Sequence, residues 1–212
     1  MIWDLPTRLF HWGLVALVLL AWRSAEIDDM HTHLLAGAGI AGLLAFRLCW
    51  GLFGSSTARF AHFVKGPKTV LAYARSLRAA SPGVGHNPMG GWSVLALLFC
   101  LLALIGFGLF AVDTDGLNSG PLADFVDYDK GRSASHWHGF AFTLLEILVG
   151  LHLLAVLFYQ LVKKHGLIEA MVSGKQRHLD GKEPLQPGSR ITLFASLAVG
   201  IAVALLLVHL SS

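Results

Sequence analysis

Four histidines lie inside long apolar stretches of this 212-residue chain, which contains eleven histidines in all. They are His11, His33, His138 and His152. An ionisable side chain is costly within a membrane, so each is a candidate for function. His138 and His152 are fourteen residues apart, close to four turns of an α-helix, which places both on one face about 21 Å apart along the axis. One helix face therefore presents an imidazole at each of two depths.

Each of these two imidazoles has a partner at a matching depth on another apolar segment. His33 opens its segment at the depth of His138, and His11 lies at the depth of His152. Imidazole is a preferred ligand of iron, and helix bundles build such sites from side chains on facing helices. Two layers of paired imidazoles predict two six-coordinate haem irons, the outer held by His33 and His138 and the inner by His11 and His152.

Two further residues in the apolar segment that His33 opens fit the same arrangement. Arg47 follows His33 by fourteen residues, so it lies near the same face at the depth of the inner pair, where its guanidinium is placed to pair with haem propionates. Gly37 comes one turn after His33 and leaves room for a macrocycle, although small residues also serve plain helix packing.

Other readings of these residues remain open. Histidines in membrane helices can be hydrogen-bonded packing residues. In a non-redox membrane anchor, the four histidines would have this packing role alone. A metal-ion transporter would mix carboxylates or cysteines with histidines around one central site. Glu146 lies near the middle of its segment. The roles of proton acceptor and interhelical hydrogen-bond partner are both open for it, and we favour the second. His31 and His136 stand two residues from a predicted ligand, about 200° around the helix, so they are expected to point away.

The elements that position these residues are five apolar segments. The chain is 55% hydrophobic and 14% charged, with a mean hydropathy of +0.63, which excludes an ordinary cytosolic or a disordered protein. Segments of about twenty apolar residues cross a bilayer as helices. The sequence predicts an all-α membrane protein with five transmembrane helices. They are expected over 9–25, 33–53, 92–112, 136–162 and 190–210.

The two cysteines, Cys49 and Cys100, both lie in apolar segments. They exclude a disulfide scaffold, a thiolate zinc site and a covalently attached c-type haem, which needs a Cys-x-x-Cys-His motif.

Charge predicts the orientation in the membrane. Thirteen of the sixteen basic residues fall in the N-terminal segment and in the loops 47–90 and 163–190. The positive-inside rule places these in the cytoplasm, with the C-terminus in the periplasm of a bacterial inner membrane. The basic excess is thus a topology signal and gives no indication of nucleic acid. Residues 68–80 predict a short helix along the inner surface. The acidic outer loop 113–129 is either plainly solvated or a docking surface for a cationic partner.

Several motifs resemble those of the bacterial cytochrome b561 and nickel–iron hydrogenase b-type cytochrome family. They are the opening WDLPTRLFHW at 3–12, HLLAG at 33–37, FRLCWG at 46–51, the Trp-His pair at 137–138 and GLIEAMVSGK at 166–175. The likeness covers roughly residues 1–178. It implies a four-helix core with two b-type haems that exchanges electrons with quinone, and His11, His33, His138 and His152 fall on the positions of its ligands. The resemblance therefore implies a four-helix transmembrane bundle that binds two haems, as a domain of residues 1–178, plus a fifth C-terminal transmembrane helix over 190–210 that lies beyond this core.

We therefore expect a respiratory electron carrier that passes electrons between the quinone pool and a periplasmic redox partner, such as a c-type cytochrome docked on loop 113–129. Two imidazoles on each iron leave no open position for oxygen chemistry. The alternative within the redox class is a quinone-reducing cytochrome b subunit of a hydrogenase-like complex, and the alternative outside it is the metal-ion transporter. Whether the chain turns over a substrate by itself is left open. The quinone is expected on the inner side, beneath Phe60 and Phe63.

Overall fold

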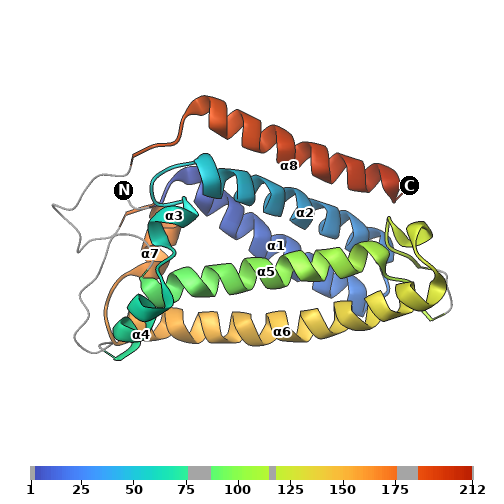
Figure 1. The fold of residues 1–212 in the computed structure, drawn as a ribbon, viewed down its shortest axis with the longest axis horizontal. Helices are drawn as coiled ribbons and strands as arrows, with labels where there is room; N and C mark the ends of the chain where they lie inside the picture. The colour runs from blue at the N-terminus through green and yellow to red at the C-terminus, as the bar shows by residue number, and fades with distance from the viewer. Residues whose placement is uncertain (1–2, 76–86, 115–117, 176–185, 212) are drawn as a thin grey trace. The chain divides into compact units, whose positions relative to one another are not determined.

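Five long helices dominate the computed structural model, which describes residues 3–75, 87–114, 118–175 and 186–211 (Figure 1). They are α1 (Leu5–Glu26), α2 (Met30–Phe53), α5 (Pro88–Phe110), α6 (Tyr128–Leu161) and α8 (Arg190–Leu210). All five are long and apolar enough to cross a membrane. Within the described ranges no strand forms, apart from an isolated bridge between Val112 and Ser119. The all-α membrane class is therefore confirmed.

Short helices connect the long ones. They are α3 (Phe60–Phe63), α4 (Pro67–Arg75), the 3-10 turn η1 (Ala123–Phe125) and α7 (Leu167–Ser173). Helix α4 occupies the first part of the helix predicted over 68–80, and residues 76–80 lie outside the described ranges. Residues 115–117 of the acidic loop lie outside them as well.

Polar residues extend two of the long helices beyond their apolar segments. Helix α6 begins at residue 128 rather than 136, where the Asp127 carboxylate accepts the backbone N–H of Lys130 at 3.0 Å. Helix α2 begins at residue 30 rather than 33, and Asp29 accepts the N–H of Thr32 at 3.1 Å. Hydrogen bonds from Thr32 lower the pKa of the Asp29 carboxyl. Hydropathy counts only apolar residues, whereas these first turns are stabilised by side-chain capping.

The chain divides into two compact units. The first unit comprises residues 1–10, 47–97 and 148–195, and the second comprises 11–46, 98–147 and 196–212. Each of the five long helices contributes one end to each unit.

The start of α1 and the end of α2 are tied together in the first unit by a buried carboxylate. Asp4 accepts Trp50 Nε1–H and the backbone N–H of Thr7, both at 2.9 Å. Trp3 packs against the fully buried Ala170 of α7. The Arg8 guanidinium adds a hydrogen bond to the carbonyl oxygen of Val172 at 2.6 Å. Three segments far apart in sequence therefore meet in this unit.

Helix α8 packs against α2 in the second unit (Figure 1). Gly42 and Gly200 lie at the contact, where a Cβ on Gly42 would stand only 2.6 Å from the Gly200 carbonyl oxygen. Ala38, Ala41 and Leu207 form a small buried cluster beside it. Small residues at such a crossing let two membrane helices approach closely.

Replacing Gly42 with leucine is expected to lower the thermal unfolding midpoint of the detergent-solubilised protein. The new side chain must push α8 away from α2, and overpacking of this kind costs about 1–3 kcal/mol. Gly150→Leu is the matched control, because a Cβ there meets nothing within 4 Å. Equal midpoints for the two variants would show that the glycine contact contributes nothing to stability.

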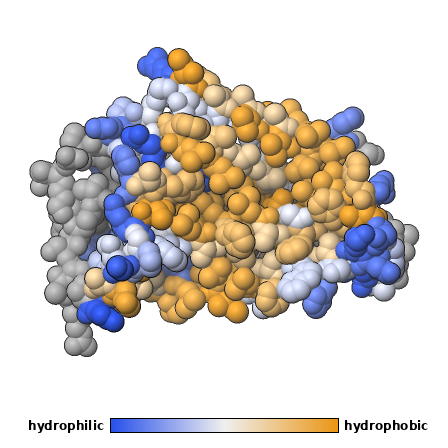
Figure 2. All heavy atoms as spheres, in the orientation of Figure 1, coloured by the Kyte–Doolittle hydropathy of each residue, from blue (hydrophilic) through white to orange (hydrophobic). Residues whose placement is uncertain are grey.

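The exposed surface of the long helices is apolar, with hydrophilic residues near the helix ends (Figure 2). Large hydrophobic side chains such as Ile147, Leu154 and Phe194 are more than half exposed. Water would disfavour so much exposed apolar area, whereas lipid accommodates it. The chain is a multi-pass membrane protein.

Candidate metal centre

His33 of α2 and His138 of α6 face each other within the second unit. Their ring centroids are 6.1 Å apart and the ring planes are inclined by 78°. When two imidazoles bind one metal ion from opposite sides, with bonds of about 2 Å, the centres of their rings lie about 6 Å apart. The structure thus brings together the two residues expected to form the outer pair, at a separation that suits one iron between them.

Both imidazoles are oriented by backbone carbonyl groups. Nδ1 of His33 lies 2.9 Å from the carbonyl oxygen of Ala21, and Nδ1 of His138 lies 2.9 Å from that of Leu104. A carbonyl only accepts, so each Nδ1 carries the proton and each Nε2 keeps its lone pair. Metal-bound histidines are characteristically held this way, by a hydrogen bond from the second ring nitrogen. The donor set therefore fits a metal bound through both Nε2 atoms.

Glycines provide the space around the pair. A Cβ on Gly108 of α5 would lie 3.0 Å from Nδ1 and Cε1 of His138, so the absence of a side chain lets this ring sit against α5. Gly37, one turn after His33, has nothing within 4 Å of its Cβ position. Open space beside two facing imidazoles suits a flat macrocycle, and we conclude that these residues fit a haem.

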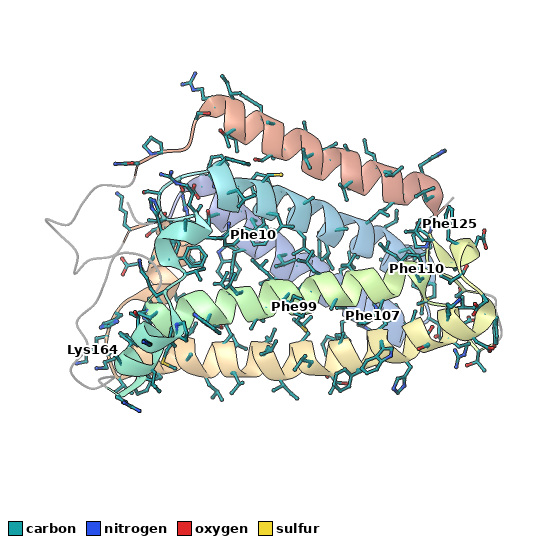
Figure 3. All side chains as sticks on the ribbon, viewed as in Figure 1. Phe10, Phe99, Phe107, Phe110, Phe125 and Lys164 are labelled. Atoms are coloured by element: carbon teal, nitrogen blue, oxygen red, sulfur yellow. The ribbon has the colours of Figure 1, made fainter. Side chains whose placement is uncertain are left out.

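Aromatic rings surround the His138 end of α6. Trp137 stacks on Phe107 with centroids 6.2 Å apart and an interplanar angle of 25° (Figure 3). The exposed ring of His136 packs on Trp137 at 5.8 Å, and His31 is also exposed. Neither of these two neighbouring histidines joins the facing pair.

The predicted inner ligands fall in different units. His152 belongs to the first unit and His11 to the second, and both are half-buried. The His11 ring contacts Trp12 edge-on at 5.0 Å. Their pairing stays a prediction. Glu146 is exposed on α6 and makes no hydrogen bond to another described residue, so the interhelical bond expected for it is not formed within the part of the chain described.

Arg47 is buried in the first unit, with 3% of its surface exposed. Its guanidinium carbon lies 4.8 Å from the centre of the Phe60 ring and 5.9 Å from that of Phe10. Nη1 donates a hydrogen bond to the carbonyl oxygen of Ala58 at 3.1 Å. Aromatic faces stabilise a cation with little water present. The sequence placed Arg47 on the right helix but gave no indication of these partners.

A second polar group in the first unit was missed by the sequence reasoning. The hydroxyl oxygens of Tyr73 on α4 and Tyr159 on α6 are 3.1 Å apart. His165 stacks on Tyr159 with centroids 5.6 Å apart. Positive φ angles at Lys164 and Gly166 turn the chain after α6, where His165 contacts this ring. No sequence spacing signals this contact, because α4 and α6 are distant in the chain.

The facing pair offers two protein ligands to one metal. No group of three or more histidines, cysteines or carboxylates gathers around a common point within the described residues. Two axial imidazoles suit haem iron, because the porphyrin supplies the four remaining nitrogens. The class that the fold and this centre define is a multi-pass membrane cytochrome of the b type.

Comparison with known proteins agrees. The sequence pattern described as prokaryotic cytochrome b561 matches residues 2–174. The chain belongs to this family, as its motifs indicated. It is also similar to a protein of Bradyrhizobium diazoefficiens named "Probable Ni/Fe-hydrogenase B-type cytochrome subunit", with 21% identity over 214 residues that cover 84% of this chain and 86% of the relative. No solved structure matches the chain significantly.

Proposed function

We propose that the chain is a dihaem cytochrome b of the bacterial inner membrane that carries electrons between the quinone pool and a periplasmic redox partner. The observation that carries the proposal is the facing pair His33 and His138, 6.1 Å apart with both Nδ1 atoms fixed by backbone carbonyls. Haem b, when bound, supplies one-electron oxidation and reduction at its iron.

The residues of the chain hold, orient and shield the proposed haems. His33 and His138 would hold the outer haem, and Gly37 would leave room beside it. His11 and His152 would hold the inner haem, and Arg47 would neutralise its propionates. An iron held by two imidazoles would keep no position for oxygen, so the chemistry supplied at both depths would be electron transfer.

The proposed organisation is a four-helix haem domain of residues 1–178, with α8 over 190–210 as an additional transmembrane helix. The proposed ligands all lie on α1, α2 and α6, and α8 contributes none. Among the described residues, basic side chains predominate in the first unit and acidic ones in the second. This asymmetry supports a cytoplasmic N-terminus and a periplasmic C-terminus.

The proposed docking face for the periplasmic partner is the acidic loop 113–129. Phe125 is 78% exposed in this loop (Figure 3) and stands next to Asp124 and two residues before Asp127 in the sequence. An apolar side chain bordered by negative charge suits a cationic partner such as a c-type cytochrome, because charge steers the encounter and the apolar contact stabilises it.

We place the quinone on the inner side, near Phe60 and Phe63. These rings contact each other edge-on with centroids 5.7 Å apart, and Phe63 is buried. They line the segment that follows α2 and would border an apolar ring bound there.

A second candidate function is the membrane cytochrome b subunit of a hydrogenase-like complex, favoured by the relative from Bradyrhizobium, which aligns over 86% of its length. Under that proposal the chain purifies together with a large metalloenzyme. Under the first it transfers electrons without one.

A reduced-minus-oxidised visible spectrum with a pyridine haemochrome count tests the proposal. We expect b-type absorbance corresponding to about two haems per chain, because the chain offers two pairs of axial imidazoles. Folded protein without haem would refute the proposal, and metal-dependent transport by that protein would then favour the transporter.

A further inference from the structure

Helix α4 carries two basic residues and one leucine on a single exposed face. Lys68, Leu71 and Arg75 are all exposed, and Leu71 keeps 53% of its surface accessible. Their spacing of three and four residues places them next to one another along one side of the helix. Tyr73 lies on the other side of α4 and is partly buried. We call Lys68, Leu71 and Arg75 the basic face.

Hydrogen bonds fix α4 against two of the membrane-spanning helices. The hydroxyl of Tyr73 lies 3.1 Å from that of Tyr159, two residues before α6 ends at Leu161. Just before α4, the carbonyl oxygen of Lys65 accepts Nε1–H of Trp92 on α5 at 2.8 Å. Both contacts lie within the first unit, where α4 is seen beside the end of α6 (Figure 1). The basic face therefore has a fixed outward direction.

These contacts also place α4 at the level of the membrane surface. Leu161 and Val162, where α6 ends, are 70% and 65% exposed, as expected for side chains in contact with lipid. The next two residues, Lys163 and Lys164, are basic, so the apolar layer ends here. Trp92 is 46% exposed, and tryptophan and tyrosine concentrate at the boundary between lipid and water. The basic face thus lies at the depth of the lipid headgroups.

The charge of the basic face is not balanced by the protein. Among the described residues one ion pair forms, between Lys130 and Asp127 in the second unit. The acids described in the first unit are Asp4, which is buried, and Glu169 on α7. No described carboxylate lies within ion-pair distance of the basic face, so anions from outside the chain can approach its two cations.

We infer that the basic face binds the headgroups of anionic phospholipids. Lys68 and Arg75 contact the phosphate groups, and Leu71 inserts among the upper parts of the acyl chains. A helix with this combination of residues is stable at the boundary of the bilayer, and basic side chains near that boundary are attracted to anionic lipids. This binding uses no predicted haem ligand, so the inference is independent of the proposed electron transfer.

Lys68→Gln combined with Arg75→Gln in the full-length purified protein tests the inference. Native mass spectrometry with phosphatidylglycerol or phosphatidylcholine added to the detergent solution measures the affinity for each lipid. We expect the unmodified chain to bind phosphatidylglycerol more tightly than phosphatidylcholine. The double variant is expected to lose roughly twentyfold in affinity for phosphatidylglycerol, because each basic side chain near an anionic surface contributes about a factor of five.

A matched control removes the same charge elsewhere. Arg23→Gln combined with Lys130→Gln changes two exposed positions in the second unit, and we expect it to keep the affinity for phosphatidylglycerol. Leu71→Ser retains both charges and is expected to weaken binding of the two lipids equally, because the acyl contact is common to both.

Three results would overturn the inference. Equal affinities of the unmodified chain for the two lipids would show that the headgroup charge is not recognised. Equal losses in the two double variants would show that net charge matters and α4 does not. Displacement of the lipid by the same concentration of inorganic phosphate would indicate a site for a soluble anion.

Failure of the proposed function gives a different result. The pyridine haemochrome count is expected to be unchanged in the Lys68→Gln and Arg75→Gln double variant. If the folded chain contains no haem, the dihaem proposal is refuted, and the lipid affinities of the same preparation still decide whether α4 binds anionic headgroups.

Discussion

We expect His138→Ala to lower the haem content of the purified protein from about two haems per chain to about one, because the substitution removes one proposed ligand of the outer iron. His138 faces His33 at 6.1 Å and is oriented by the Leu104 carbonyl, so no neighbouring side chain replaces its imidazole. The pyridine haemochrome count relative to protein measures this loss directly. His33→Ala is expected to give the same result.

Neighbouring histidines provide matched controls for both substitutions. His136→Ala and His31→Ala remove the same chemical group two residues away, from exposed positions that do not join the pair. Both variants are expected to keep the full haem content. Equal losses in His136→Ala and His138→Ala would show that haem loss follows from general damage to the helix and would contradict the assigned ligand.

We expect Gly108→Val to produce a comparable loss of haem, although it leaves every proposed ligand residue unchanged. A Cβ at this position lies 3.0 Å from the His138 ring, and the branched side chain of valine adds two methyl groups beyond it. The imidazole must then leave the position at which it donates to Leu104. We expect the haem content to fall by about half, since one of two centres loses its geometry.

Gly106→Val is the control for this second substitution. It makes the same change two residues earlier in the same helix, where a Cβ meets nothing within 4 Å. Its cost in helix propensity is therefore comparable, and it is expected to retain haem. If both valine variants bind haem fully, close approach of α5 to His138 is not required for the centre.

Local patterns in the sequence predicted much of the fold. The length of the apolar segments predicted the five membrane helices, because a segment that spans the bilayer must satisfy its backbone hydrogen bonds internally. Helical periodicity predicted that His138 and His152 share one face, and their matching depths predicted that His33 pairs with His138. The beginning of α6 at residue 128 was missed, since it depends on capping by Asp127 rather than on hydropathy.

These local patterns could not predict contacts between residues that are far apart in the sequence. The carbonyl acceptors of Ala21 and Leu104 are backbone atoms, which carry no residue signature in a sequence. Ser55, just after α2, resembles an ordinary loop residue in the sequence, and only the structure shows that it is fully buried. Glu146 was assigned a partner because carboxylates are rare in membrane segments, whereas the structure leaves its side chain exposed.

The two carbonyl groups that orient the facing histidines have a consequence for mutational tolerance. Because Ala21 and Leu104 contribute main-chain oxygens, replacing either side chain leaves the acceptor in place. The course of the α1 and α5 backbones therefore determines that Nδ1 carries the proton, whatever side chains stand at these two positions. Genetic drift at these two positions leaves the ligand tautomer intact, and sensitivity to substitution is concentrated at the imidazoles themselves and at Gly108.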